Sequence, residues 1–123
     1  MKIRVLLVDD DQAVLVTLAR TLSVKRDIEV VGEALDGADA VELATSVPAD
    51  VIVMDERMPT MSGLEATRRI REAGIAAPIL MFTADDAVED RIIDLTNVRF
   101  LSKGRAGFRA VPDAVRELAG GER

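Results

Sequence analysis

The chain has 123 residues, of which 49% are hydrophobic and 31% are charged, and its formal net charge is -6 at pH 7. This length and composition fit one globular domain. The acidic excess argues against direct binding to DNA, because contacts to phosphate groups need basic patches. The chain has no Cys and no His, which excludes disulfides, thiol nucleophiles, a histidine base and ordinary zinc sites.

No apolar run approaches the length of a membrane span, and the N-terminus lacks the pattern of a signal peptide. We therefore expect a cytoplasmic protein with no membrane partner. The sequence contains no repeat, low-complexity segment or internal linker, so residues 1–123 are expected to form a single domain.

The first half of the chain alternates predicted strands with predicted helices. Ile3–Val8 is short, apolar and mostly branched, which predicts a buried parallel strand. Apolar residues then recur at helical spacing from Val14 to Leu22, and Ile28–Ala34 predicts a second strand. A second helix follows and ends before Pro48, because proline interrupts helical hydrogen bonding.

The second half continues the alternation with three more strands and three more helices. The predicted elements are a strand at Val51–Met54, a helix from Leu64 to about Gly74, a strand at Ile79–Thr83, a helix marked by Val88, Ile92 and Ile93, a strand at Val98–Ser102, and a last helix that starts near Pro112. Five strands alternating with five helices, (βα)5, indicate a doubly wound, five-stranded parallel α/β sheet of the flavodoxin-like type.

Charged and polar side chains stand at the ends of four predicted strands. They are Asp9, Asp10 and Asp11 after the first strand, Asp55 after the third, Thr83 at the end of the fourth and Lys103 after the fifth. The carboxyl ends of parallel strands share one edge of the sheet, so these groups are expected to converge. Crowded carboxylates repel one another and call for a cation, and oxygen ligands without His or Cys suit Mg²⁺.

Simpler interpretations exist for single residues of this set. An acidic residue after a strand is usually a turn former or a helix N-cap. We expect Asp11 to cap the first helix, and Asp55 taken alone would also be read as a cap. The combination of four strand ends with complementary chemistry favours a functional site.

The order of these motifs resembles the CheY-like response-regulator receiver family. The matching segments are V-D-D-D, then V-I-V-M-D-E-R-M-P-T-M-S-G-L-E-A, then M-F-T-A and F-L-S-K. Together with V-V-G-E-A-L-D-G-A-D-A-V at 30–41, the chain looks most like the NarL/LuxR-type transcriptional regulators. The resemblance covers essentially the whole chain and is most specific from Val51 to Arg71.

The resemblance implies a phosphorylation site with bound Mg²⁺. Asp55 matches the phosphoacceptor of the family. Asp9 and Asp10 match the acidic pair that holds Mg²⁺ together with Asp55, with Asp10 as the expected direct ligand. Arg57 matches the position whose backbone carbonyl also binds the metal.

Other matches surround the phosphoryl group or respond to it. Thr83 matches the hydroxyl that hydrogen-bonds the acyl phosphate, and Lys103 matches the lysine that neutralises a phosphoryl oxygen. Phe100 matches the aromatic switch residue whose rotamer follows the threonine, although core packing explains this residue equally well. The residues that shape the pocket or leave it accessible are Met58, Pro59, Gly63 and Ala84.

The resemblance also implies the partners and the activity. A sensor histidine kinase would supply the phosphoryl group, and phosphorylation would promote a homodimer. DNA would be bound only through a C-terminal domain that is not in this chain. The domain would catalyse nothing beyond its own phosphorylation and dephosphorylation, and its output would control transcription.

The chain departs from the family pattern near the expected output face. The small Gly-Ala turn that usually precedes the fifth strand is replaced by D-L-T-N-V-R-F at 94–100. The segment after Lys103 reads G-R-A-G-F-R-A-V-P, which is longer and more basic than usual. The conformation of residues 94–112 is therefore not predicted by analogy.

Two other functions compete with a signalling receiver. A haloacid dehalogenase-like phosphatase also begins with Asp-x-Asp after its first strand, as Asp9 and Asp11 do, and Asp9 would then be the nucleophile. Against it, Ala13 stands where Thr or Val is expected, and no cap domain fits in the chain. A degenerate receiver that binds a partner without phosphorylation is the other alternative, which the complete set of acidic, Thr and Lys residues disfavours.

Overall fold

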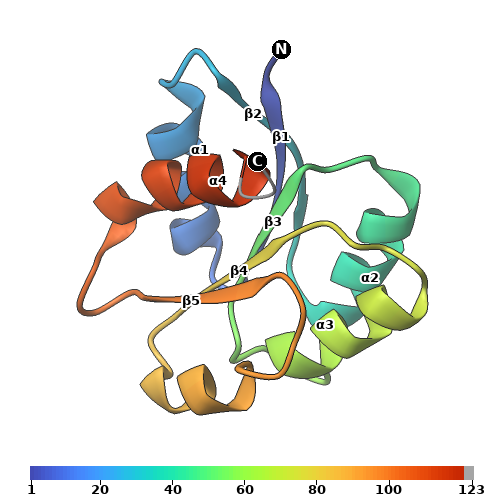
Figure 1. Cartoon of the computed structure of the whole chain (residues 1–123). Coiled ribbons are helices and arrows are strands. Elements are labelled where there is room, and N and C mark those ends of the chain that lie inside the picture. The colour runs from blue at the N-terminus through green and yellow to red at the C-terminus, as the bar shows by residue number, and fades with distance from the viewer. Residues whose placement is uncertain (121–123) are drawn as a thin grey trace.

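The computed structural model describes residues 1–120, which form one parallel sheet with helices on both faces (Figure 1). The elements are β1 Ile3–Val8, α1 Gln12–Ser23, β2 Ile28–Ala34, α2 Gly37–Ser46, β3 Val51–Met54, α3 Gly63–Glu72, β4 Ile79–Thr83, the 3-10 helix η1 Asp86–Arg91, β5 Val98–Ser102, the 3-10 helix η2 Phe108–Ala110 and α4 Val111–Gly120. Within the described residues, no helix is long and apolar enough to cross a membrane.

The sheet is apolar on both faces because each face is covered by helices. α1 and α4 pack on one face, and α2 and α3 on the other (Figure 1). Alternate residues of one strand therefore point into different clusters, as Val5 and Leu6 of β1 do. This two-sided burial explains why the predicted strands read as nearly continuous apolar runs.

The strand order β2-β1-β3-β4-β5 confirms the predicted doubly wound fold. All neighbouring strands are parallel. The direction of winding reverses between β1 and β3, and ligands of such sheets bind outside the carboxyl ends of the strands at this point. Asp9 and Asp55 are the first residues after these two strands, so the fold places both carboxylates at the switch point.

The fourth predicted helix is where the structure corrects the sequence interpretation. An α-helix was expected around Val88, Ile92 and Ile93, but the segment forms the short 3-10 helix η1, which ends at Arg91. Val88 and Ile92 are buried as expected, whereas Ile93 is 80% exposed. Val88 and Ile92 anchor this short helix, and the residues that follow Ile92 lead to β5.

An asparagine replaces the missing glycine turn before β5. Asn97 has φ of 58°, in the left-handed region that asparagine tolerates better than most residues. The guanidinium of Arg71, on α3, holds this turn by donating to the carbonyls of Thr96 and Asn97. It also donates to the carbonyls of Ile75 and Ala77 in the connection that leads to β4.

We expect Asn97→Ala to destabilise the domain by about 1 kcal/mol, because alanine pays more than asparagine for a left-handed backbone. Asn97→Gly should be neutral or slightly stabilising, since glycine adopts this conformation without strain. Urea unfolding followed by circular dichroism measures both variants, and Thr96→Ala, whose backbone φ is not positive, is the matched control. Equal stability of the Ala and Gly variants would contradict the explanation.

The basic segment after Lys103 forms a turn that is anchored to the core by Phe108. Gly107 has φ of 74°, which favours glycine at this position. The Phe108 ring packs edge-on against Phe82 of β4, with ring centroids 5.3 Å apart. The segment thus leads into α4 along the edge of the core, while Arg105 and Arg109 remain exposed.

Candidate functional site

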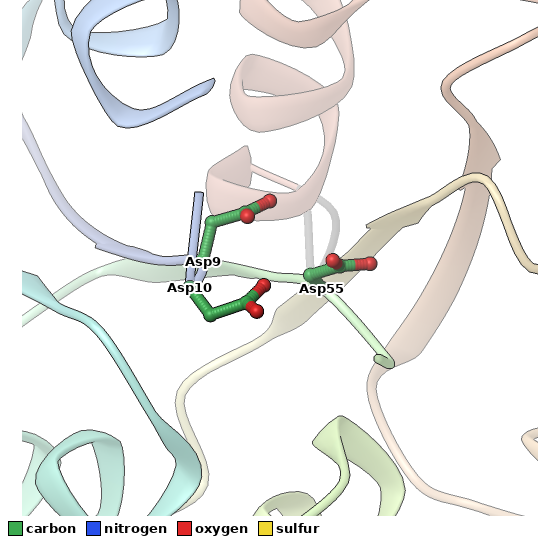
Figure 2. Close-up of side chains that lie close together, drawn as sticks. All are labelled: Asp9, Asp10 and Asp55. Carbon is green, nitrogen blue, oxygen red and sulfur yellow. The ribbon is translucent and has the colours of Figure 1, made fainter. Parts of the chain in front are cut away.

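Three carboxylates meet at the switch point of the sheet. Asp9 and Asp10 follow β1, and Asp55 follows β3 (Figure 2). One oxygen from each carboxylate lies within 4.8 Å of the others, a spacing that could hold a metal ion. Asp9 is 1% exposed and Asp55 is 7% exposed, whereas Asp10 is exposed. The cluster is therefore mostly buried and opens to solvent at Asp10.

Lys103, which follows β5, neutralises part of this charge. Its Nζ lies 2.7 Å from Oδ2 of Asp9 and 3.4 Å from Oδ2 of Asp55. Burial alone would lower the pKa of Lys103, but the hydrogen bond to Asp9 and the charge of Asp55 outweigh it and raise the pKa. Lys103 thus stays protonated between two carboxylates.

Backbone amides fix the directions of the two buried carboxylates. The Asp11 N–H donates to Oδ1 of Asp9 at 2.9 Å, and the Glu56 N–H donates to Oδ1 of Asp55 at 2.8 Å. Burial nevertheless raises the pKa of Asp9 above its usual value. The side chain of Asp11 accepts from the Ala13 N–H and caps α1, which confirms the cap interpretation for that residue.

Thr83 and Arg57 lie beside the cluster in different environments. Thr83 is buried at the end of β4, and its hydroxyl oxygen accepts from the Asp85 N–H at 3.1 Å. The carbonyl of Thr83 accepts from the Lys103 N–H at 2.9 Å, which ties the ends of β4 and β5 together. The exposed side chain of Arg57 pairs with Asp85 at 3.4 Å. Ala84 is exposed between these groups, as the family pattern requires.

Phe100 is half-buried on β5 and packs against the apolar cluster that contains Met81 and Val88. Its ring is also covered by the guanidinium of Arg105, 5.7 Å from the ring centroid. Core packing therefore describes this residue in the present conformation, and its role as a switch stays a prediction.

The loop between β3 and α3 packs tightly on the site. Met58 and Pro59 line a shallow pocket next to Asp10. A Cβ added at Gly63 would lie 2.2 Å from the carbonyl oxygen of Asp55, so only glycine lets α3 start this close to the site. These positions match the loop residues singled out in the sequence.

Glu56 is a residue of this site that the sequence interpretation overlooked. It is 7% exposed, and its Oε1 accepts from the Leu64 N–H at 2.7 Å. Burial raises the pKa of its carboxyl, while the hydrogen bond from Leu64 opposes this effect. Its position as the second residue after a fully buried strand was the available signal, because an acidic side chain that is buried there needs a hydrogen-bond partner.

The model of the response regulator receiver domain family matches residues 5–107 of this chain. The response regulator MprA of Mycobacterium ulcerans is 42% identical over 118 residues, which cover 96% of this chain and 47% of that protein. The transcriptional regulatory protein LiaR of Bacillus subtilis is 38% identical over 122 residues, which cover 98% of this chain and 57% of that protein. This chain thus spans about half the length of these curated relatives.

Solved structures agree with the sequence matches. The signal receiver domain of the response regulator NarL from Mycobacterium tuberculosis superposes with a TM-score of 0.89 at 31% identity, and the match covers 98% of both chains. The chain therefore belongs to the family of response regulator receiver domains of two-component systems. This confirms the class that the resemblance of the strand-end motifs implied.

Proposed function

We propose that this domain accepts a phosphoryl group on Asp55 from a sensor histidine kinase and changes its output face in response. The observation that carries the proposal is the junction of Asp9, Asp10 and Asp55 with Lys103 at the switch point of a receiver fold. Residues 1–123 contain no histidine, so the phosphohistidine donor lies outside this domain. The domain then acts only on itself, by taking up and hydrolysing its own phosphoryl group.

Mg²⁺ fits the donors that the site offers. The carboxylates of Asp9, Asp10 and Asp55, with the backbone carbonyl of Arg57, are the residues that would hold it. All are hard oxygen ligands, which Mg²⁺ prefers, and the exposed side of Asp10 leaves room for its waters. When bound, the ion offsets the negative charge shared by the carboxylates and the incoming phosphoryl group.

The remaining groups align and neutralise the phosphoryl group. As the bond to the donor histidine breaks, an oxygen of Asp55 forms the new bond to phosphorus. Lys103 offsets charge on a phosphoryl oxygen, and the hydroxyl of Thr83 can turn from Asp85 to hydrogen-bond another. Phosphoryl transfer depends mainly on such alignment and charge compensation.

The burial of Asp9 supports Asp55, and not Asp9, as the acceptor. Asp9 is 1% exposed and its Oδ2 lies 2.7 Å from Nζ of Lys103, whereas Asp55 is 7% exposed and its Oδ2 lies 3.4 Å from the same nitrogen. This disfavours the phosphatase alternative, in which Asp9 is the nucleophile. We expect incubation with acetyl phosphate and Mg²⁺, followed by borohydride reduction and peptide mass spectrometry, to mark Asp55. Label on Asp9 would refute the proposal, and a complete lack of label would favour a degenerate receiver.

We also expect Mg²⁺ to stabilise the fold through this site. A ligand that binds only the folded state adds roughly 2.7 kcal/mol at 100 times its Kd. Thermal melts followed by circular dichroism measure the shift, because the chain has no Trp or Tyr for intrinsic fluorescence. Asp10→Ala should lose most of the shift, while Glu42→Ala, an exposed carboxylate of α2, should keep it. An undiminished shift in Asp10→Ala would place the ion elsewhere.

The output is proposed to run through Thr83 and Phe100. Drawing the Thr83 hydroxyl toward the phosphoryl group frees space for the half-buried Phe100 ring to turn inward. Burial of an aromatic side chain contributes roughly 1.5–3 kcal/mol, enough to bias two states of similar energy. The surface of η1, β5 and the segment before α4 would then change.

We expect this changed surface to promote a homodimer. Sedimentation with and without beryllofluoride and Mg²⁺ tests the expectation, with Asp55→Asn, which cannot form the acyl-phosphate mimic, as the control. A monomer in both states, at concentrations near a millimolar, would mean that the output acts on another domain or partner.

We further propose that residues 1–123 are the receiver part of a cytoplasmic transcription regulator. The relatives are about twice as long as this chain, and one of them is a transcriptional regulatory protein. DNA would then be bound by a C-terminal domain, since the receiver carries a net negative charge. The reading frame beyond Arg123 tests this part, and a stop codon there would refute it.

A further inference from the structure

Glu56 accepts hydrogen bonds from the first two N–H groups of α3. A helix begins with N–H groups that have no partner within the helix. The Gly63 N–H donates to the carbonyl of Glu56 at 2.9 Å, and the Leu64 N–H donates to Oε1 of Glu56 at 2.7 Å. Ser62, the N-cap, accepts the Glu65 N–H at 3.1 Å. Glu56 therefore joins the end of β3 to the start of α3.

The same residue contacts the proposed phosphoacceptor. The Glu56 N–H donates to Oδ1 of Asp55 at 2.8 Å. On its other side it precedes Arg57, whose carbonyl is a proposed Mg²⁺ ligand. The backbone of Asp55 is itself pressed against Gly63, as the 2.2 Å distance to an added Cβ demonstrates. Residues 55–57 are thus held by α3 through Glu56.

We propose that Glu56 is a positioning residue for phosphorylation of Asp55, with its side-chain oxygen, as acceptor of the Leu64 N–H, fixing the backbone that presents Asp55 and the Arg57 carbonyl. The inference rests on the proposed function of Asp55. This positioning role requires a hydrogen-bond acceptor at the end of a side chain as long as that of Glu56, and it does not require a negative charge. Residues that orient metal ligands typically alter metal affinity or activity about 10–100-fold when they are replaced.

Three substitutions of Glu56 distinguish the effect of its hydrogen-bond acceptor from the effects of its negative charge and of its side-chain length. Glu56→Gln keeps a carbonyl oxygen at the same distance and removes the charge. Glu56→Asp keeps the charge and shortens the side chain, so it no longer reaches the Leu64 N–H. Glu56→Ala removes both. Ser62→Ala is the matched control, because it removes the other cap of the same helix end and leaves the contacts of Glu56 in place.

Mg²⁺ affinity, measured by calorimetric titration, and the rate of phosphorylation by acetyl phosphate are compared at a temperature where circular dichroism finds each variant folded. We expect Glu56→Ala and Glu56→Asp to lose about tenfold in affinity and in rate, while Glu56→Gln and Ser62→Ala stay near wild type. If Glu56→Ala fails to fold, Glu56→Asp against Glu56→Gln decides.

Three results would overturn the inference. They are wild-type affinity in Glu56→Asp, an equal loss in Glu56→Gln, and an equal loss in Ser62→Ala, which would reduce the effect to fraying of α3. A failure of the proposed function looks different, because the wild-type protein itself would then bind no Mg²⁺ or take no phosphoryl group, and both proposals would fall.

Discussion

Asp55→Asn is expected to abolish phosphorylation while the fold is kept. The amide has the shape of the carboxylate, and its oxygen can still accept from the Glu56 N–H. It is not a nucleophile toward phosphorus, however, and no other oxygen in the cluster is equally placed. The change also removes one of three crowded negative charges, so the variant should unfold at the same temperature as the wild type or above it.

Intact-mass spectrometry after incubation with acetyl phosphate and Mg²⁺ measures the outcome. Asp36→Asn is the matched control, because Asp36 caps α2, is not part of the cluster of Asp9, Asp10 and Asp55, and asparagine caps helices equally well. The control and the wild type are both expected to gain one phosphoryl group. Full phosphorylation of Asp55→Asn would refute the assignment of Asp55 as the phosphoacceptor.

Lys103→Ala is expected to lower the free energy of unfolding by about 3 kcal/mol in the absence of Mg²⁺. The side chain of Asp9 is only 2% exposed, and Lys103 is its charged partner. Removal of one member of a buried ion pair leaves the other charge without compensation, which costs more than the pair itself contributes. Mg²⁺ would compensate the same carboxylates, so it should restore part of the loss.

Urea unfolding of Lys103→Ala, with and without Mg²⁺, tests both statements. Lys2→Ala serves as the control, since Lys2 is exposed at the start of the chain. An unchanged free energy of unfolding would show that Asp9 needs no partner. If Mg²⁺ does not reduce the loss in free energy of unfolding, the ion does not bind at this cluster. Whatever its stability, Lys103→Ala should be phosphorylated by acetyl phosphate more slowly than the wild type, because the phosphoryl oxygen loses its positively charged neighbour.

The strands could be predicted to the residue because burial on both faces of the sheet requires nearly continuous apolar runs. Val51–Met54, for example, is apolar throughout and ends where Asp55 begins. The segment at 86–91 could not, because the i,i+4 spacing of Val88 and Ile92 predicts an α-helix, whereas the chain forms the 3-10 helix η1 and leaves it at Ile92. The type of helix was decided by tertiary packing and by the turn at Asn97, which local periodicity does not report.

The centre of the site followed from the sequence for a topological reason. Parallel strands bring their carboxyl ends to one edge, so Asp9, Asp55 and Lys103 had to be close. The contacts of Glu56, by contrast, depend on how α3 begins eight residues later. Contacts that loop residues make with other elements, such as that of Arg105 with the Phe100 ring, depend on chain directions that residue spacing leaves open.

The short η1 helix bears on how readily the segment beside Thr83 can rearrange. Only Val88 and Ile92 of the segment from Asp86 to Ile93 are buried, whereas β4 beside it is buried throughout. Segments with few buried apolar side chains open locally at a small fraction of the global unfolding free energy. We therefore expect η1, beside Thr83, to open locally at a lower free energy than the buried sheet. A small change in free energy at the sheet edge can therefore shift the population of the open form of this segment without loosening the core.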